Sequence, residues 1–166
     1  MSDEPSGETF VTGLEYPRPF DEYAVRLAQS ATRYLCILSP RLDHAAFDTA
    51  ALADALSALA RASRQTHIRI LVSDSRELVG RGHRLLQLAR RLPSKVLIQK
   101  LPEHPDWNGQ TVVIRDRDGV LYKPGGSDHD AFYEPASRAS TARHLDLFEE
   151  LWRYSARDPE LRSLSL

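Results

Sequence analysis

The chain is poor in cysteine, aromatic residues and long apolar runs. Its 166 residues include one cysteine, Cys36, so no disulfide can form within it, and a reducing compartment is expected. No stretch approaches the roughly 18 consecutive apolar residues of a membrane span. The acidic start "MSDEPSGETF" also lacks the basic and apolar regions of a secretory signal. We therefore expect a soluble, cytoplasmic protein.

Charge of either sign is in little excess. The formal net charge is -1 and the sequence pI is about 6.6, which gives no strong nucleic-acid signal. The charges are unevenly distributed, however, because residues 61–100 hold 10 Lys and Arg against two acidic residues. If these cations share one surface, an anionic small molecule or a protein becomes a plausible partner.

The hydrophobic pattern predicts one α/β domain over residues 15–155, with a disordered arm at 1–14 and a tail at 156–166. Alternating helices and strands favour a three-layer fold, in which a mixed but mostly parallel sheet has helices on both faces. Helices are expected at 20–31, 50–63, 82–92 and 141–155. Strands are expected at 34–38, 67–72 and 95–101, followed by a hairpin at 111–123, where Asp118 and Gly119 form the turn.

This order of elements resembles one half of the phospholipase D superfamily. The resemblance rests on a strand ending at Ser39 and Pro40, on the strand "IRILV" and on the final "FEELW" at 148–152. The family signature is His-x-Lys, four residues and Asp, followed by Gly-Ser-x-Asn. Asp116 fits the Asp of that signature, which places Gly109 at the His position and Thr111 at the Lys position.

The second part of the signature fits the loop that follows the hairpin. Ser127 matches its Ser, and His129 falls at the Asn position. The resemblance implies that the missing His would attack phosphorus and that the missing Lys would bind phosphoryl oxygens. It also implies that a single half would form a homodimer to bring two signatures together.

Two functions remain open on these residues. The first is a catalytically inactive binding or regulatory module for an anionic ligand or a protein, without a cofactor. The second is a phosphodiesterase or phosphatase with a rebuilt site around Asp116, Ser127 and His129. "GHRLLQLARRLPSKVLI", residues 82–98, also resembles uncharacterised bacterial domains that are sometimes joined to acetyltransferases.

The ligand-binding prediction falls on the helix at 82–92. Its polar face can offer hydrogen bonds and positive charge to an anion, and the face consists of His83, Arg84, Gln87, Arg90 and Arg91. The start of the helix beside Gly82 would add free backbone N–H groups. A solvated amphipathic face explains the same pattern.

Other polar groups have simpler interpretations. "SDHD" at 127–130 could bind a metal together with His104 or His144, but a polar turn is favoured and no metal is expected. Asp43 and His44 follow the first strand, and Asp74 and Ser75 follow the second. Ligands bind beyond such strand ends in α/β sheets, although helix capping is the favoured role of these residues.

Overall fold

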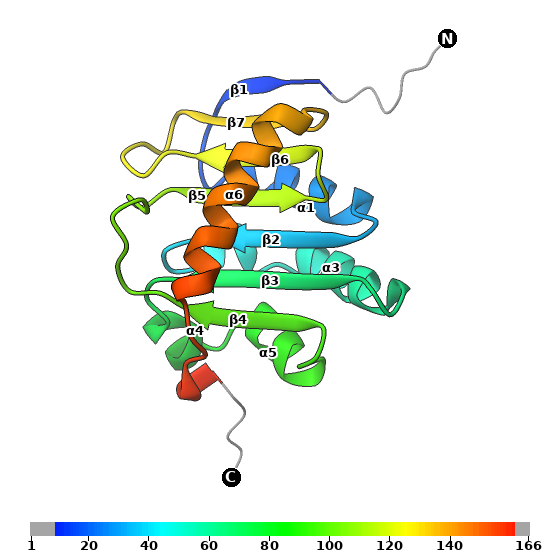
Figure 1. The fold of residues 1–166 in the computed structure, drawn as a ribbon, viewed down its shortest axis with the longest axis vertical. Coiled ribbons are helices and arrows are strands. Elements are labelled where there is room, and N and C mark those ends of the chain that lie inside the picture. The colour runs from blue at the N-terminus through cyan, green and yellow to red at the C-terminus, as the bar shows by residue number, and fades with distance from the viewer. Residues whose placement is uncertain (1–8, 162–166) are drawn as a thin grey trace.

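The computed structural model describes residues 9–161, and these residues form one seven-stranded sheet. The strands lie in the order β1-β7-β6-β5-β2-β3-β4 (Figure 1). Their bounds are β1 Val11–Leu14, β2 Tyr34–Leu38, β3 His67–Val72, β4 Val96–Lys100, β5 Thr111–Arg115, β6 Gly119–Lys123 and β7 Ala131–Glu134.

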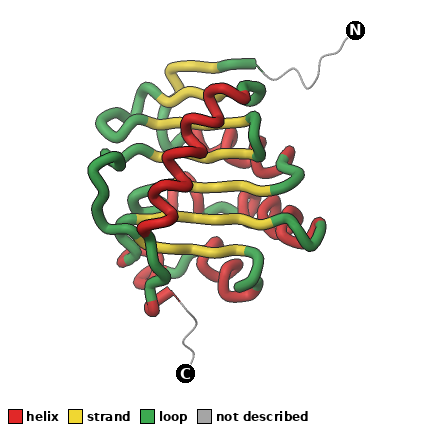
Figure 2. Tube along the Cα trace, viewed as in Figure 1, coloured by secondary structure: helices red, strands yellow, loops and turns green. Residues whose placement is uncertain are grey.

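Helices cover both faces of the sheet. α6 crosses one face, and α1, α3 and α5 lie on the other (Figures 1 and 2). No helix among the described residues is long and apolar enough to cross a bilayer. The helices are α1 Phe20–Ser30, α2 His44–Phe47, α3 Ala50–Ala62, α4 Arg76–Arg81, α5 Arg84–Arg91 and α6 Arg138–Tyr154, followed by the 3-10 turn η2 Pro159–Leu161.

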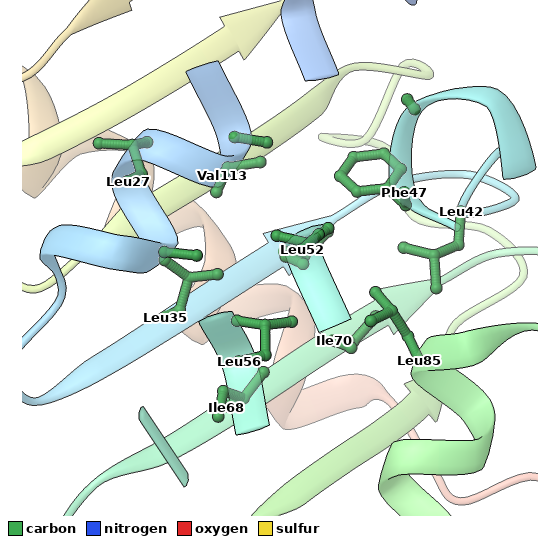
Figure 3. Packing of buried hydrophobic residues seen from close by; sticks show 14 of the residues in the cluster. Leu27, Leu35, Leu42, Phe47, Leu52, Leu56, Ile68, Ile70, Leu85 and Val113 are labelled. Carbon is green, nitrogen blue, oxygen red and sulfur yellow. The ribbon is translucent and has the colours of Figure 1, made fainter. Parts of the chain in front are cut away.

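The apolar run at β2 explains why the sheet is covered on both sides. Successive side chains of a strand point to opposite faces. Leu35 and Ile37 therefore pack with α1 and α3, whereas Cys36 and Leu38 pack beneath α6. Figure 3 shows the larger core, in which Leu52 of α3 lies over the sheet. Every β2 residue after Tyr34 is buried.

The predicted α/β architecture is confirmed, but the share of parallel pairs is lower than expected. Only β2-β3 and β3-β4 are parallel, and the other four pairings are antiparallel. The expectation of a mostly parallel sheet was wrong because β5 returns alongside β2 and the hairpin then continues into β7 and β1. Neither β1 nor β7 was predicted from the sequence.

The ends of the chain also differ from prediction. Val11–Leu14 forms β1 inside the expected arm, and Leu161 is buried inside the expected tail. Residues 1–8 and 162–166 of those two segments lie outside the described residues. The helix predicted at 82–92 begins two residues later, because Gly82 has φ +71° and His83 is extended.

Candidate functional site

The residues of the proposed rebuilt site lie at both ends of β5. Asp116 follows the last residue of that strand, whereas Lys123, which leads into the Ser127 loop, pairs with its first residue, Thr111. At roughly 3.3 Å per residue, about 16 Å of strand separates the two ends. Asp116 therefore cannot share a site with Ser127 and His129.

Asp116 is occupied by the segment that enters β2. Its carboxylate accepts the backbone N–H groups of Thr32, Arg33 and Tyr34 at 2.8–3.0 Å, and the Thr32 hydroxyl at 3.1 Å. Burial alone would raise the pKa of Asp116, but these bonds outweigh burial and hold it below its ordinary value. Asp116 thus caps the start of β2, with φ +50°.

Ser127 and His129 lie in one exposed loop but do not form a nucleophile and base. The Ser127 hydroxyl donates to Asp130 at 2.8 Å and accepts the backbone N–H of His129 at 3.0 Å. The His129 imidazole instead pairs with Glu15, with Nδ1 2.8 Å from Oε1. That hydrogen bond raises the pKa of His129. A nucleophilic serine requires its base within hydrogen-bond reach, and here the imidazole is directed elsewhere.

Two loops touch through their backbones at the edge of the sheet where β5 begins. Gly109 has φ +85°, and Thr111 is 3% exposed. A Cβ atom on Gly125 would lie 2.0 Å from the carbonyl oxygen of Asn108, so the two loops touch at backbone distance. Only glycine, which has no Cβ atom, fits at position 125 without a shift of the backbone.

Lys123 is the partner of Thr111 across the hairpin, and its ammonium group is already paired. Its ammonium group lies 3.2 Å from a carboxylate oxygen of Asp128 and donates to the Pro124 carbonyl at 3.0 Å. It also sits 5.1 Å from the centre of the Tyr16 ring. The side chain is 9% exposed, so a ligand would have to displace these partners.

A cavity of about 300 Å³ opens at the same edge, and its lining is acidic. Tyr16 donates a 2.6 Å hydrogen bond to Asp43 there. Burial is the main cause that raises the pKa of Tyr16 well above its ordinary value, so the phenol stays protonated. Three carboxylates and one guanidinium line the cavity, and they belong to Asp43, Glu77, Asp128 and Arg81.

The predicted basic face of α5 is only partly available. His83 is 1% exposed, so its assignment to that face was wrong. Its Nδ1 accepts the Leu85 N–H at 3.1 Å, and its Nε2 bonds the Leu42 carbonyl at 3.0 Å. Asp48 takes the Arg84 N–H at 3.0 Å, so neither of these first N–H groups is free for an anion.

The arginines of α5 differ in their surroundings. Arg84 pairs with Asp48 at 3.2 Å, and Arg90 donates to the carbonyls of Leu161 and Glu160. Gln87 and Arg91 are exposed. The surface is therefore less basic than a count of its arginines suggests.

The strand-end residues have mixed roles. Asp43 is the N-cap residue of α2 by position, but its side chain makes no capping bond and accepts from Tyr16 instead. Ser75 likewise bonds Asp158 at 2.7 Å instead of capping α4, and Asp74 pairs with Arg76. His44 bonds the Gly82 carbonyl at 2.8 Å. The favoured capping role was wrong for the Asp43 and Ser75 side chains.

The sequence of the chain matches one known protein family. A sequence model described as "Domain of unknown function (DUF7931)" matches residues 16–164. The chain belongs to the DUF7931 family. No curated protein matches the sequence of this DUF7931 chain.

Solved structures agree on its fold. Nuc, a phospholipase D family member from Salmonella typhimurium, is 14% identical with a TM-score of 0.65, over 93% of this chain and 99% of Nuc. NucT from Helicobacter pylori is 13% identical with a TM-score of 0.60, over 90% of this chain and 99% of NucT. The predicted phospholipase D-like fold is therefore confirmed, although such low identities establish only the fold.

An archaeal chromatin protein has a similar fold. TrmBL2 is 12% identical with a TM-score of 0.66, over 93% of the DUF7931 chain. The chain spans only 56% of TrmBL2, whose structure is described as showing a novel mode of DNA binding. The same fold thus occurs in a phospholipase D family member and in a chromatin protein.

Sequence reasoning missed the acidic character of the cavity. Tyr16 and Asp128 lie in loops 112 residues apart, and the strand order brings them together with Asp43. One signal was available, because Asp128 falls inside the Gly-Ser-x-Asn stretch of the resemblance. Its pairing with Lys123 depended on the register of the hairpin.

Proposed function

We propose that this DUF7931 chain is a binding module for an anionic ligand and does not carry out phospholipase D chemistry. The acidic lining of the 300 Å³ cavity is the main observation against phospholipase D chemistry. A phosphodiester is negatively charged, and like charges disfavour its entry. Gly109 offers no nucleophile at the His position of the resemblance, and Thr111, at its Lys position, is buried and uncharged.

The rebuilt hydrolase is the weaker candidate. It would need Asp116 beside Ser127 and His129, and Asp116 instead holds the entry to β2. Ser127 lacks a hydrogen bond from the His129 ring. A hydrolase built from these three residues would require a different arrangement of the hairpin.

A direct assay tests the catalytic half of the proposal. Bis(p-nitrophenyl) phosphate and p-nitrophenyl phosphate are incubated with the wild-type chain and with His129→Ala. We expect no release of nitrophenolate above the rate without protein. Turnover that His129→Ala abolishes would overturn the proposal in favour of the rebuilt site, and turnover that survives this change would overturn it in favour of another site.

The proposal that the chain binds an anion rests on the uneven distribution of cations over the surface of the protein. Net charge is close to zero, yet arginines outnumber carboxylates on parts of the surface. The DNA binding of TrmBL2 suggests phosphate-bearing ligands as a class to test first. Titration calorimetry with phosphate and AMP addresses this half, and binding of neither compound would remove it.

Ligand binding by the α5 surface and formation of a homodimer remain predictions. Arg91→Glu tests the first, because Arg91 is exposed and its replacement should not disturb packing. Sedimentation velocity tests the second, and a monomer at micromolar concentration would contradict it. The phospholipase D-like fold does not by itself require either.

A further inference from the structure

A second cavity lies at the opposite edge of the sheet, where β2 and β3 begin, and it has the opposite charge. Its volume is about 570 Å³, within the range of small-molecule sites. Four guanidinium groups face two carboxylates in its lining. These charged residues, which with Tyr34 and His67 we call the arginine pocket, are Arg33, Arg69, Arg117, Arg138, Asp146 and Glu149.

Arg69 is a fixed part of the wall. It makes a bidentate pair with Glu149, with nitrogen to oxygen distances of 3.0 and 2.6 Å. Its guanidinium carbon lies 5.1 Å from the centre of the Phe148 ring and 5.4 Å from that of Trp152. Because Glu149 neutralises Arg69, the remaining guanidinium groups determine the charge that a ligand meets.

Three arginines remain for a ligand. Arg33 and Arg138 are exposed, and their guanidinium groups have no ion pair with any residue in 9–161. Arg117 is also exposed. Burial raises the pKa of Tyr34, and the nearby positive charge of Arg117 acts against that rise. Asp146 is the one carboxylate of the lining that Arg69 does not engage. The accessible lining therefore has an excess of positive charge, and guanidinium groups bind phosphate with paired N–H donors.

The walls of the arginine pocket are held by hydrogen bonds from neighbouring segments. Asp116 accepts the N–H groups of Arg33 and Tyr34, and this fixes the backbone that carries both side chains. Arg115 is 9% exposed, and it donates to Ser30, Asp118 and Pro135. These bonds connect the end of α1, the β5-β6 turn and the end of β7.

An aromatic surface lies beside the cations. The rings of Tyr34 and His67 are stacked, with centres 5.6 Å apart and planes 21° apart. Both residues and Arg33 also line an adjoining cavity of about 470 Å³, which reaches Thr66. A ligand can therefore contact cations and aromatic rings at once.

We infer that the arginine pocket binds a phosphomonoester of mononucleotide size. Arg33, Arg117 and Arg138 hold the phosphate, and the Tyr34 and His67 rings contact the rest of the ligand. This inference rests on the proposed anion-binding function and assigns its site and ligand class. The site lies about one strand length from the edge where the phospholipase D resemblance places catalysis.

Isothermal titration calorimetry with the full chain at low ionic strength tests the inference. The probes are AMP, adenosine and sodium phosphate. We expect AMP to bind more tightly than phosphate, and adenosine to give no measurable heat. Arg33→Glu/Arg138→Glu should weaken AMP binding about tenfold or more, because each lost contact is a charged hydrogen bond.

Arg18→Glu/Arg157→Glu is the matched control. It makes the same change of charge at two exposed arginines outside the arginine pocket, and AMP binding should stay within about twofold of wild type. Circular dichroism spectra that match wild type establish that both variants are folded.

The outcomes separate the two proposals. If wild type binds neither AMP nor phosphate, both the anion-binding function and the arginine pocket fail. If AMP binding survives Arg33→Glu/Arg138→Glu, or falls equally in the control, binding stands but the assigned pocket is wrong. Equal affinities for AMP and adenosine would overturn recognition of the phosphate.

Discussion

Asp116 Oδ1 lies 3.0 Å from the backbone nitrogen of Tyr34, which precedes it by 82 residues. The same carboxylate takes three further hydrogen bonds from Thr32 and Arg33. One side chain thus joins the end of β5 to the start of β2. The position that fits the Asp of the phospholipase D signature thus connects two strands of the sheet.

Replacing Asp116 should destabilise the fold. Asp116→Ala removes all four bonds and places alanine at φ +50°, so the free energy of unfolding should fall by about 2–4 kcal/mol. Asp116→Asn tolerates this backbone conformation and keeps an acceptor, so its loss should be smaller. Urea denaturation followed by circular dichroism measures both.

Asp54→Ala is the matched control for this change. Asp54 is exposed within α3, and the variant should stay within about 0.5 kcal/mol of wild type. An Asp116→Ala variant as stable as this control would show that the β2 entry does not depend on the carboxylate.

The buried His83 should make stability depend on pH. Burial is the main cause that lowers the pKa of His83 to about 4, against an ordinary value of 6.5. Between these values the unfolded chain binds a proton that the folded chain does not. Stability should therefore be complete above about pH 6.5 and decrease by on the order of 3 kcal/mol as the pH falls to 4.

His83→Asn should flatten this dependence. The variant cannot titrate at this position, so its free energy of unfolding should change less than that of wild type between pH 6 and 4. His129→Asn removes an exposed imidazole and should leave the wild-type slope over that interval. Equal slopes in wild type and His83→Asn would contradict the buried neutral imidazole.

Two adjacent glycines should respond differently to alanine. Gly125→Ala places a methyl group 2.0 Å from the Asn108 carbonyl oxygen, so a backbone shift should reduce stability by about 1–3 kcal/mol. A Cβ atom on Gly126 meets no atom within 4 Å, and Gly126→Ala should lie within about 0.5 kcal/mol of wild type. Melting temperatures of the two variants decide this, and equal values would contradict the close contact.

Cys36 should be unreactive in the folded protein. Its side chain is buried, and burial raises the pKa of the thiol to about 12, so little thiolate exists at pH 8. Ellman's reagent should react with one thiol per chain in urea and at least about a hundred times more slowly in buffer. Rapid reaction of the folded chain would show that the space beneath α6 opens readily.

Local patterns predicted the central elements well. The apolar run at β2 and the Ala- and Leu-rich α3 are predictable because buried apolar residues recur along the sequence with the spacing of a strand or of a helix. The short strands β1 and β7 were missed, since each has four residues and is held in place by pairing, β7 with β6 and β1 with β7. Long-range pairing of this kind leaves little local signal.

The arginine pocket could not be predicted from spacing. Arg33 precedes β2, Arg117 lies in a turn and Arg138 begins α6, so they are far apart in sequence. They converge because β5 pairs antiparallel with β2, and no local rule determines that pairing. The count of cations at 61–100 directed attention to α5 instead, where folding pairs Arg84 with Asp48.

The contacts of Arg115 have a consequence for the rate of recognition. Because this side chain joins three segments beside the arginine pocket, no loop has to become ordered when a ligand arrives. Association should therefore proceed in a single bimolecular step, with an observed rate that rises linearly with ligand concentration. Opposite charges would accelerate that encounter, and added salt would slow it.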